Sequence, residues 1–172
     1  MTIKTLRLVL RNWLPADAPQ LFRLAKDRDI GEIAGWPPHE NLKYTENLLK
    51  DVATDPLSFA VTKDDELVGC VELMAADKAN IPLGENEAEI GFWIGKPFWG
   101  NGYVTEAVKG AICYAFDKLN LSRLWCCYFD GNEKSRRVGE KCGFTYHHTE
   151  KDTYWPAMNY TKTMHVCMLE RH

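Results

Sequence analysis

The most regular pattern along the chain is helical and begins at Val104. Apolar residues follow at positions 107, 108, 111, 112, 115, 116 and 119, the spacing of one face of an α-helix over about four turns. This spacing predicts an amphipathic helix that packs against a sheet. Shorter helical patterns cover 17–27, 41–54 and 134–142.

Strands are indicated by apolar residues at every second position or in short apolar runs. Leucines at positions 6, 8 and 10 mark the first strand. Further strands are predicted at 58–62, 67–74, 88–94, 124–129, 144–150 and 163–171. Asp64 and Asp65 supply the turn of a hairpin between the second and third strands. The segment 31–38 ends in two prolines and is expected to be an irregular connector.

Strands come first in this order, and strands alternating with helices follow, which predicts an α/β (α+β) fold. We expect one domain over residues 1–172, with a mixed central sheet of about six to seven strands and about four helices packed against it. No internal repeat, low-complexity tract or linker interrupts the sequence.

Composition narrows the classes of partner. The net charge is −3, which argues against a basic surface for nucleic acid. No apolar run approaches the roughly 20 residues that span a bilayer, and residues 1–10 lack the apolar block of a signal peptide. The six cysteines lie in apolar segments without a Cys-x-x-Cys pair, as expected for buried, reduced thiols. We therefore expect a cytoplasmic protein without nucleic-acid or membrane partners.

Candidate chemistry begins in the glycine-containing segment before the long helix. Gly100 and Gly102 allow a tight turn in which the backbone comes close to a ligand. The helix that follows offers unpaired N–H groups and the positive end of its dipole, which suit a phosphate or pyrophosphate. The alternative is a simple strand-to-helix connection in which Thr105 caps the helix.

Two nucleotide-binding motifs are excluded here. A Walker A loop needs a Lys-Ser/Thr pair after its second glycine, but Tyr103 and Val104 follow Gly102. A dinucleotide-binding fingerprint needs a third glycine where Thr105 stands. A weaker phosphate loop remains.

A second motif downstream identifies the family. The run Asn132-x-x-Ser135 leads into a helix that ends in Lys141-x-Gly143-Phe144, where the glycine suits a C-cap. Together with the runs 91–94 and 98–107, and with Leu-x-Leu-Arg-Asn-Trp at 8–13, it resembles the GNAT superfamily of acetyl-CoA-dependent N-acetyltransferases. Within that superfamily the chain looks like the branch that acetylates the N-termini of ribosomal proteins. The resemblance covers residues 5–169.

The resemblance implies acetyl-CoA as co-substrate, bound in a cleft where the fourth and fifth strands splay apart. It implies contacts to pantetheine from the strand and from Asn132, contacts to pyrophosphate from the glycine loop, and Ser135 near the sulfur. The implied residues are Phe92, Trp93, Ile94, Trp99, Gly100, Asn101, Gly102, Tyr103, Val104, Thr105, Asn132 and Ser135. Trp99 and Val104 depart from the superfamily's Gln/Arg-x-x-Gly-x-Gly/Ala pattern, as they do in the ribosomal-protein branch. The cluster Lys134, Arg136 and Arg137 suits either cofactor phosphates or an exposed helix face.

Two residues are predicted to be catalytic. Glu89 is the candidate base, because it shares a strand face with Gly91 and Trp93; the alternative is a solvent-facing glutamate. In many GNAT enzymes, a tyrosine seven residues after the helix asparagine acts as the acid that protonates the departing thiolate. In this sequence Gly139 occupies that position. Ser135, one turn earlier, is the expected substitute as donor to the sulfur; the alternative is a bond to its own helix. A glycine inside a helix also predicts close packing at that point.

Acceptor recognition is predicted for aromatic residues in loops, namely Trp36, Tyr154 and Trp155. The predicted reaction is acetyl transfer to a primary amine by direct attack in a ternary complex, without a metal. The acceptor is a protein N-terminus, or alternatively a small amine such as an amino acid, polyamine or aminoglycoside. A non-catalytic module that binds a CoA ester is the competing class. Exposed edge strands would allow a homodimer.

Overall fold

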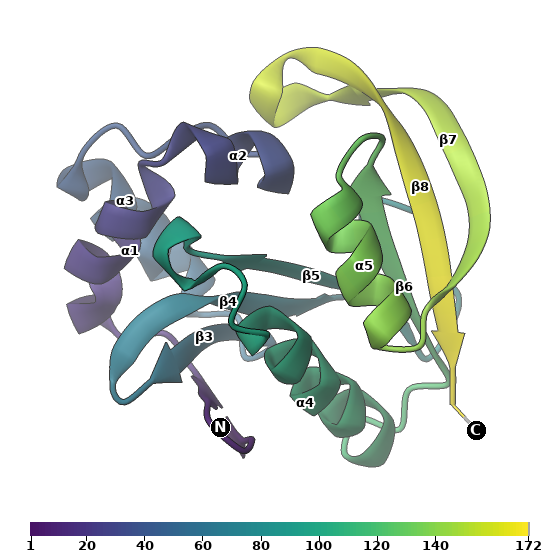
Figure 1. The fold of residues 1–172 in the computed structure, drawn as a ribbon, viewed down its shortest axis with the longest axis horizontal. Coiled ribbons are helices and arrows are strands. Elements are labelled where there is room, and N and C mark those ends of the chain that lie inside the picture. Colours follow the sequence, from purple (N-terminus) through teal and green to yellow (C-terminus); the bar gives the residue numbers. More distant parts are fainter. Residues whose placement is uncertain (172) are drawn as a thin grey trace.

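The computed structural model describes residues 1–171, which form a single mixed sheet with helices on both faces (Figure 1). The sheet has eight strands in the order β1-β2-β3-β4-β5-β6-β8-β7. Their bounds are β1 Thr2–Lys4, β2 Val9–Arg11, β3 Ser58–Lys63, β4 Glu66–Met74, β5 Glu87–Ile94, β6 Arg123–Phe129, β7 Thr145–Trp155 and β8 Tyr160–Glu170. The predicted fold class is confirmed, with slightly more strands than expected.

Five α-helices cover the sheet: α1 Ala18–Ala25, α2 Arg28–Ala34, α3 Leu42–Val52, α4 Tyr103–Asp117 and α5 Glu133–Lys141. The apolar face of α4 packs against Phe59 and Val61 of β3. The residue between them, Ala60, belongs to the core under α1 and α3. Alternate residues of a strand point to opposite faces, so the central strands are buried on both sides and read as continuous apolar runs.

The cleft between the predicted fourth and fifth strands is confirmed; these strands are β5 and β6. They form the one parallel pair among the described strands, and they pair only over 87–89 and 123–125. Beyond that point β6 pairs with β8 alone, while β5 continues along β4 (Figure 1). The rest of β5 therefore has a free backbone edge facing the gap between the two strands.

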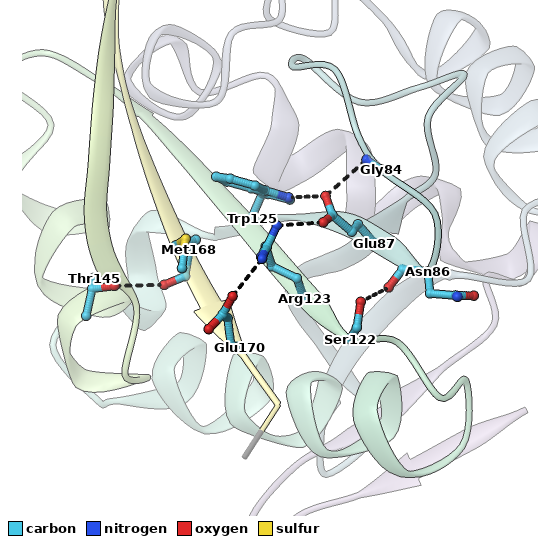
Figure 2. A network of polar contacts seen from close by, with 9 residues as sticks. All are labelled: Gly84, Asn86, Glu87, Ser122, Arg123, Trp125, Thr145, Met168 and Glu170. Atoms are coloured by element: carbon cyan, nitrogen blue, oxygen red, sulfur yellow. Dashed lines mark hydrogen bonds and ion pairs between the residues drawn. The ribbon is translucent and has the colours of Figure 1, made fainter.

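An ionic network holds the closed end of this cleft (Figure 2). Arg123 of β6 donates to Glu87 of β5 at 2.8 Å and to Glu170 of β8 at 2.6 Å. Glu87 also accepts from the indole nitrogen of Trp125 at 2.7 Å and from the backbone N–H of Gly84 at 3.0 Å. Burial opposes ionisation of Glu87, but these donors and Arg123 together lower its pKa. The network fixes where the strands separate.

The N-terminal segment differs from its prediction. The leucine alternation predicts one strand, but the chain forms a β1–β2 hairpin, and Leu6 lies in its connection with 92% of its surface exposed. A local bond from the Thr5 N–H to the Leu8 carbonyl closes this turn. Glu106 of α4 accepts from the Thr5 hydroxyl and from the Arg7 N–H, each at 2.7 Å. These contacts hold the hairpin turn and leave Leu6 outside the core.

The connector 31–38 also differs, because its first half is helical. The Asp27 carboxylate accepts from the Asp29 N–H and caps α2, which runs to Ala34 and ends at Gly35 in the left-handed conformation. A proline restricts mainly itself and the residue before it, so Pro37 and Pro38 leave the four residues from position 31 free to be helical.

The C-terminal hairpin is longer than predicted, so Tyr154 and Trp155 lie in β7 rather than in a loop. A register shift between Tyr146 and His148 breaks the alternation of β7 and brings the two adjacent histidine rings together. Four cysteines are buried as expected, but Cys113 on α4 is exposed. Within residues 1–171, no helix has the length and apolar character needed to cross a membrane.

Candidate functional site

The glycine loop between β5 and α4 has the geometry of an anion site. Gly100 and Gly102 have φ values of 80° and 75°, in the left-handed region that favours glycine. No heavy atom lies within 4 Å of the place where a Cβ on Gly100 would stand. α4 begins at Tyr103, so the free N–H groups of its first turn face the same loop.

Asn101 serves the loop itself. Its side-chain amide donates to the carbonyls of Phe98 at 3.1 Å and Trp99 at 3.2 Å. Its own carbonyl accepts from the Arg7 guanidinium at 3.1 Å. The Trp99 indole donates to the Ile94 carbonyl at 2.9 Å and so ties the loop to the end of β5. These bonds fix the loop before any ligand binds.

A cavity of about 410 Å³ lies between this loop, the free edge of β5 and α5. Of the twelve residues predicted to bind the cofactor, all but Asn101 and Asn132 line it. Three cations of α5 line it as well: Lys134, Arg137 and Lys141. The Lys134 ammonium lies 3.4 Å from the centre of the Trp99 ring.

Arg136, on the same helix, points elsewhere and pairs with Glu133 and Glu140. The predicted cluster of Lys134, Arg136 and Arg137 is therefore divided between two sides of the helix. Lys134 and Arg137 face the cavity, together with Lys141, whereas Arg136 belongs to an exposed ionic pair network. The residues present fit a polyanionic ligand with an extended apolar arm.

A second cavity of about 320 Å³ lies on the opposite side of the gap. It is lined by the predicted catalytic residues Glu89 and Ser135, by Asn132, and by the aromatic residues Trp36 and Trp155. Phe92, Trp93 and Ser135 line both cavities. The two cavities therefore adjoin beside Ser135.

Glu89 is not the solvent-facing glutamate of the alternative interpretation, because only 2% of its surface is exposed. Its two carboxylate oxygens accept from the Asn80 backbone N–H at 2.6 Å and from the Asn80 side-chain amide at 2.8 Å. Burial raises the pKa of Glu89, although the bonds from Asn80 and Cys127 partly oppose the shift. A carboxyl group whose pKa is raised is a stronger base than an ordinary glutamate, and one that lines a cavity can act on a ligand there.

Ser135 and Asn132 form a pair at the start of α5. The Asn132 side-chain oxygen accepts from the Ser135 N–H at 3.1 Å and caps the helix. The Asn132 amide donates to the Ser135 hydroxyl oxygen at 2.9 Å. Gly139 occupies the position at which many GNAT enzymes have a tyrosine. The space beside it is not crowded, because a Cβ there would meet nothing nearer than Phe144 Cβ at 3.9 Å. The prediction of close packing at Gly139 is therefore wrong.

Two of the three predicted acceptor residues, Trp36 and Trp155, line the second cavity, and Tyr154 does not. The Trp36 ring lies edge-on to Trp93 at a centroid distance of 5.9 Å. Trp155 donates from its indole to the Gly35 carbonyl at 2.6 Å, a bond that joins the C-terminal hairpin to the end of α2. Tyr154 does not line the cavity; it is 57% exposed and donates to Asn159.

Several polar residues of the second cavity were not predicted, among them Glu72, Asn80 and Cys127. Cys127 shares a face of β6 with Phe129, which lines the same cavity, so the alternation of that strand could have indicated it; the place of Glu72 depends on the register of β4 against β5. Asn80 lies in the irregular segment between β4 and β5, where the sequence carries no positional signal.

Comparison with known proteins places this geometry in a family. The sequence model of the family described as "Acetyltransferase (GNAT) domain" matches residues 7–145. The "Putative ribosomal N-acetyltransferase YdaF" of Bacillus subtilis is 44% identical over 81 residues, which are 47% of this chain and 42% of that protein. Spermidine N(1)-acetyltransferase of Escherichia coli K12 is 28% identical over 112 residues, 65% of this chain and 58% of that one.

Solved structures agree at the level of the fold. The GNAT-family acetyltransferase from Bacillus anthracis superposes with a TM-score of 0.85 at 23% identity, covering 99% of this chain and 98% of the other. Because the family match extends over most of the sequence, the assignment does not depend on any single relative. This chain belongs to the GNAT acetyltransferase family.

Proposed function

We propose that this chain transfers an acetyl group from acetyl-CoA to a primary amine by direct attack in a ternary complex. The observation that carries the proposal is the meeting of the two cavities beside Ser135, Phe92 and Trp93. One cavity has the shape and charge for the cofactor, and the other holds a buried carboxylate for the amine. Acetyl-CoA supplies the activated acetyl thioester.

The cofactor cavity divides its work between backbone and side chains. The N–H groups from Gly100 to Thr105 suit the pyrophosphate, and the free edge at 92–94 suits the amides of the pantetheine arm. Lys134 and Arg137 add positive charge for the phosphates. Trp99 and Val104 do not stand in the way, because the anion contacts of this loop come from the backbone.

In the reaction, the amine nitrogen attacks the thioester carbonyl carbon, a C–N bond forms and the C–S bond breaks. Glu89 accepts the proton that the nitrogen loses, and the Ser135 hydroxyl donates a hydrogen bond to the departing thiolate. A positioned base contributes about 10²- to 10⁴-fold. An acetyl-cysteine intermediate is disfavoured, since burial strongly raises the pKa of Cys127, the nearest thiol to Glu89.

The acceptor that suits the second cavity is a small primary amine. The cavity is limited in volume, and the bond between Trp155 and Gly35 joins two elements at its wall. A protein N-terminus is the second candidate, supported by the name of the relative YdaF. The cytoplasmic location, the one-domain organisation and the homodimer stay predictions of the sequence.

The first test is thermal unfolding with acetyl-CoA, with ATP and NAD as controls. A ligand at about 100 times its Kd adds about 2.7 kcal/mol to the free energy of unfolding, which raises Tm by several degrees. We expect acetyl-CoA alone to do so, and an amine then to release free thiol from it. A Tm rise without thiol release from any amine would instead identify a binding module. The absence of any rise would overturn the proposed cofactor site.

A further inference from the structure

A second carboxylate, Glu72, faces the acceptor cavity from β4. It shares a strand face with Cys70 and Met74, which line the same cavity. The residue opposite it in β5 is Gly91, which has no side chain to cover the carboxylate. Glu72 is therefore open to the cavity although the surrounding strands partly bury it.

No charged partner neutralises Glu72. Its carboxylate forms no hydrogen bond or ion pair within residues 1–171, and Lys78, the cation whose charge acts on it, is paired with Asp55. Burial, and then the negative charges of Asp55 and Glu89, raise the pKa of Glu72, while Lys78 lowers it. A cation that enters the cavity would therefore stabilise the ionised form of Glu72.

The strand register sets the spacing of the Glu72 and Glu89 positions along the sheet. Glu72 pairs with Gly91, and Met74 pairs with Glu89, so Glu72 and Glu89 are diagonal neighbours in an antiparallel pair. The Cα atoms of such diagonal neighbours are about 7–8 Å apart, and both side chains lie on the same face of the sheet. Aromatic rings complete the walls, among them Trp36, Trp93 and Trp155, and the faces of such rings attract ammonium groups.

We propose that Glu72 binds a second positive charge of the acceptor, so that the preferred acceptor is a small diamine. The inference rests on the function proposed above. Glu89 takes the proton of the nitrogen that is acetylated, whereas the other nitrogen keeps its proton and pairs with Glu72. A four-carbon diamine spans a separation of this order, and a monoamine leaves Glu72 without a partner.

The experiment compares two acceptors of equal length, 1,4-diaminobutane and 1-aminopentane, in which a methyl group replaces the second ammonium group. Thiol release is measured with wild type, with Glu72→Gln, and with Glu66→Gln as the matched control. Glu66 lies on the same strand but pairs with Arg23 on the exposed surface.

For wild type we expect kcat/KM for the diamine to exceed that for the monoamine by at least about tenfold, as for a charge-assisted contact, and beyond the twofold advantage of two equivalent amines. Glu72→Gln should remove this preference by raising KM for the diamine, with kcat for both amines nearly unchanged. Glu66→Gln should change neither.

Two results would overturn the inference while leaving the proposed function in place. One is equal use of both amines by wild type, and the other is an equal loss for both amines in Glu72→Gln, which would indicate a structural role. The wild-type comparison does not depend on the folding of any variant. If neither these nor other amines release thiol, the proposed function fails and this inference fails with it.

Discussion

The Asn132 side-chain amide donates a hydrogen bond to the Ser135 hydroxyl oxygen at 2.9 Å. Within the described residues, the Ser135 hydroxyl donates to no acceptor in return. The serine oxygen is thus held in place by a donor, while its own hydrogen stays available. A hydroxyl in this state can donate to a thiolate without first giving up another partner.

Ser135→Ala should lower kcat by about 10²-fold, the effect of removing one positioned donor to developing negative charge. The Kd for acetyl-CoA should stay within about twofold, because most of the implied cofactor contacts come from other residues. Single-turnover thiol release measures the first effect and the acetyl-CoA thermal shift the second. Ser135→Thr, which keeps a hydroxyl, is the matched control and should retain most of the activity. Full activity in Ser135→Ala would refute the role of the hydroxyl.

Glu89 predicts a pH profile. Its pKa is raised by burial, so the group becomes a competent base only above the pKa of an ordinary glutamate. In wild type, kcat/KM calculated per neutral amine should therefore rise with pH through this raised value, and Glu89→Gln should lower kcat/KM by about 10²- to 10⁴-fold and abolish that limb. A wild-type profile of kcat/KM per neutral amine that stays flat as pH rises above the ordinary glutamate pKa, or one that Glu89→Gln leaves unchanged, would contradict a base at this position.

The same shift has a consequence for stability. The folded chain binds the Glu89 proton more tightly than the unfolded chain does. The stability that this proton contributes is complete below the ordinary glutamate pKa and is lost as pH rises through the raised one. Glu89→Gln should remove this dependence from urea unfolding. The substitution should also lower the free energy of unfolding by about 1–3 kcal/mol, because the glutamine NH₂ group would face one of the two Asn80 donors without an acceptor.

The sequence predicted those parts of the site that depend on backbone chemistry. Gly100 and Gly102 could be recognised because a left-handed turn before a helix favours glycine. Glu72 could not, because an acidic residue in a strand is ordinary on an exposed face. Glu72 faces the cavity because Gly91, its partner on β5, has no side chain. This pairing depends on the strand register, which the sequence of one strand alone does not determine.

The fold shows the same division. The long helix and the central strands follow from periodicity, because their apolar residues repeat with the spacing of one element. α2 was missed since its N-cap, Asp27, lies before the glycine and prolines that dominate the pattern. The bulge at Tyr146 and His148 was missed because a register shift is decided by the partner strand, β8.

The two arginines at the centre of α5 offer a matched pair for the cofactor site. Arg137 lines the cofactor cavity, whereas Arg136 pairs with Glu133 and Glu140 on the other side of the helix. Arg137→Ala should weaken acetyl-CoA binding about five- to tenfold, with an effect that shrinks as salt is added. Arg136→Ala should leave the Kd within about twofold. Equal effects of both variants in calorimetric titration would show that α5 acts only through its overall charge.

Gly139 is a helix position at which the chain gives up stability without a steric reason. It lies in α5 with no positive φ, and a Cβ would meet only Phe144 Cβ at the ordinary contact distance of 3.9 Å. Glycine loses more backbone entropy on folding than alanine does. Gly139→Ala should therefore raise the free energy of unfolding by about 0.5–1 kcal/mol, measured by urea unfolding, with acetyl-CoA binding unchanged. A loss of stability would mean that α5 packs closer to Phe144 than this geometry shows. Gly139 would then be required for packing at the position where many GNAT enzymes have a tyrosine.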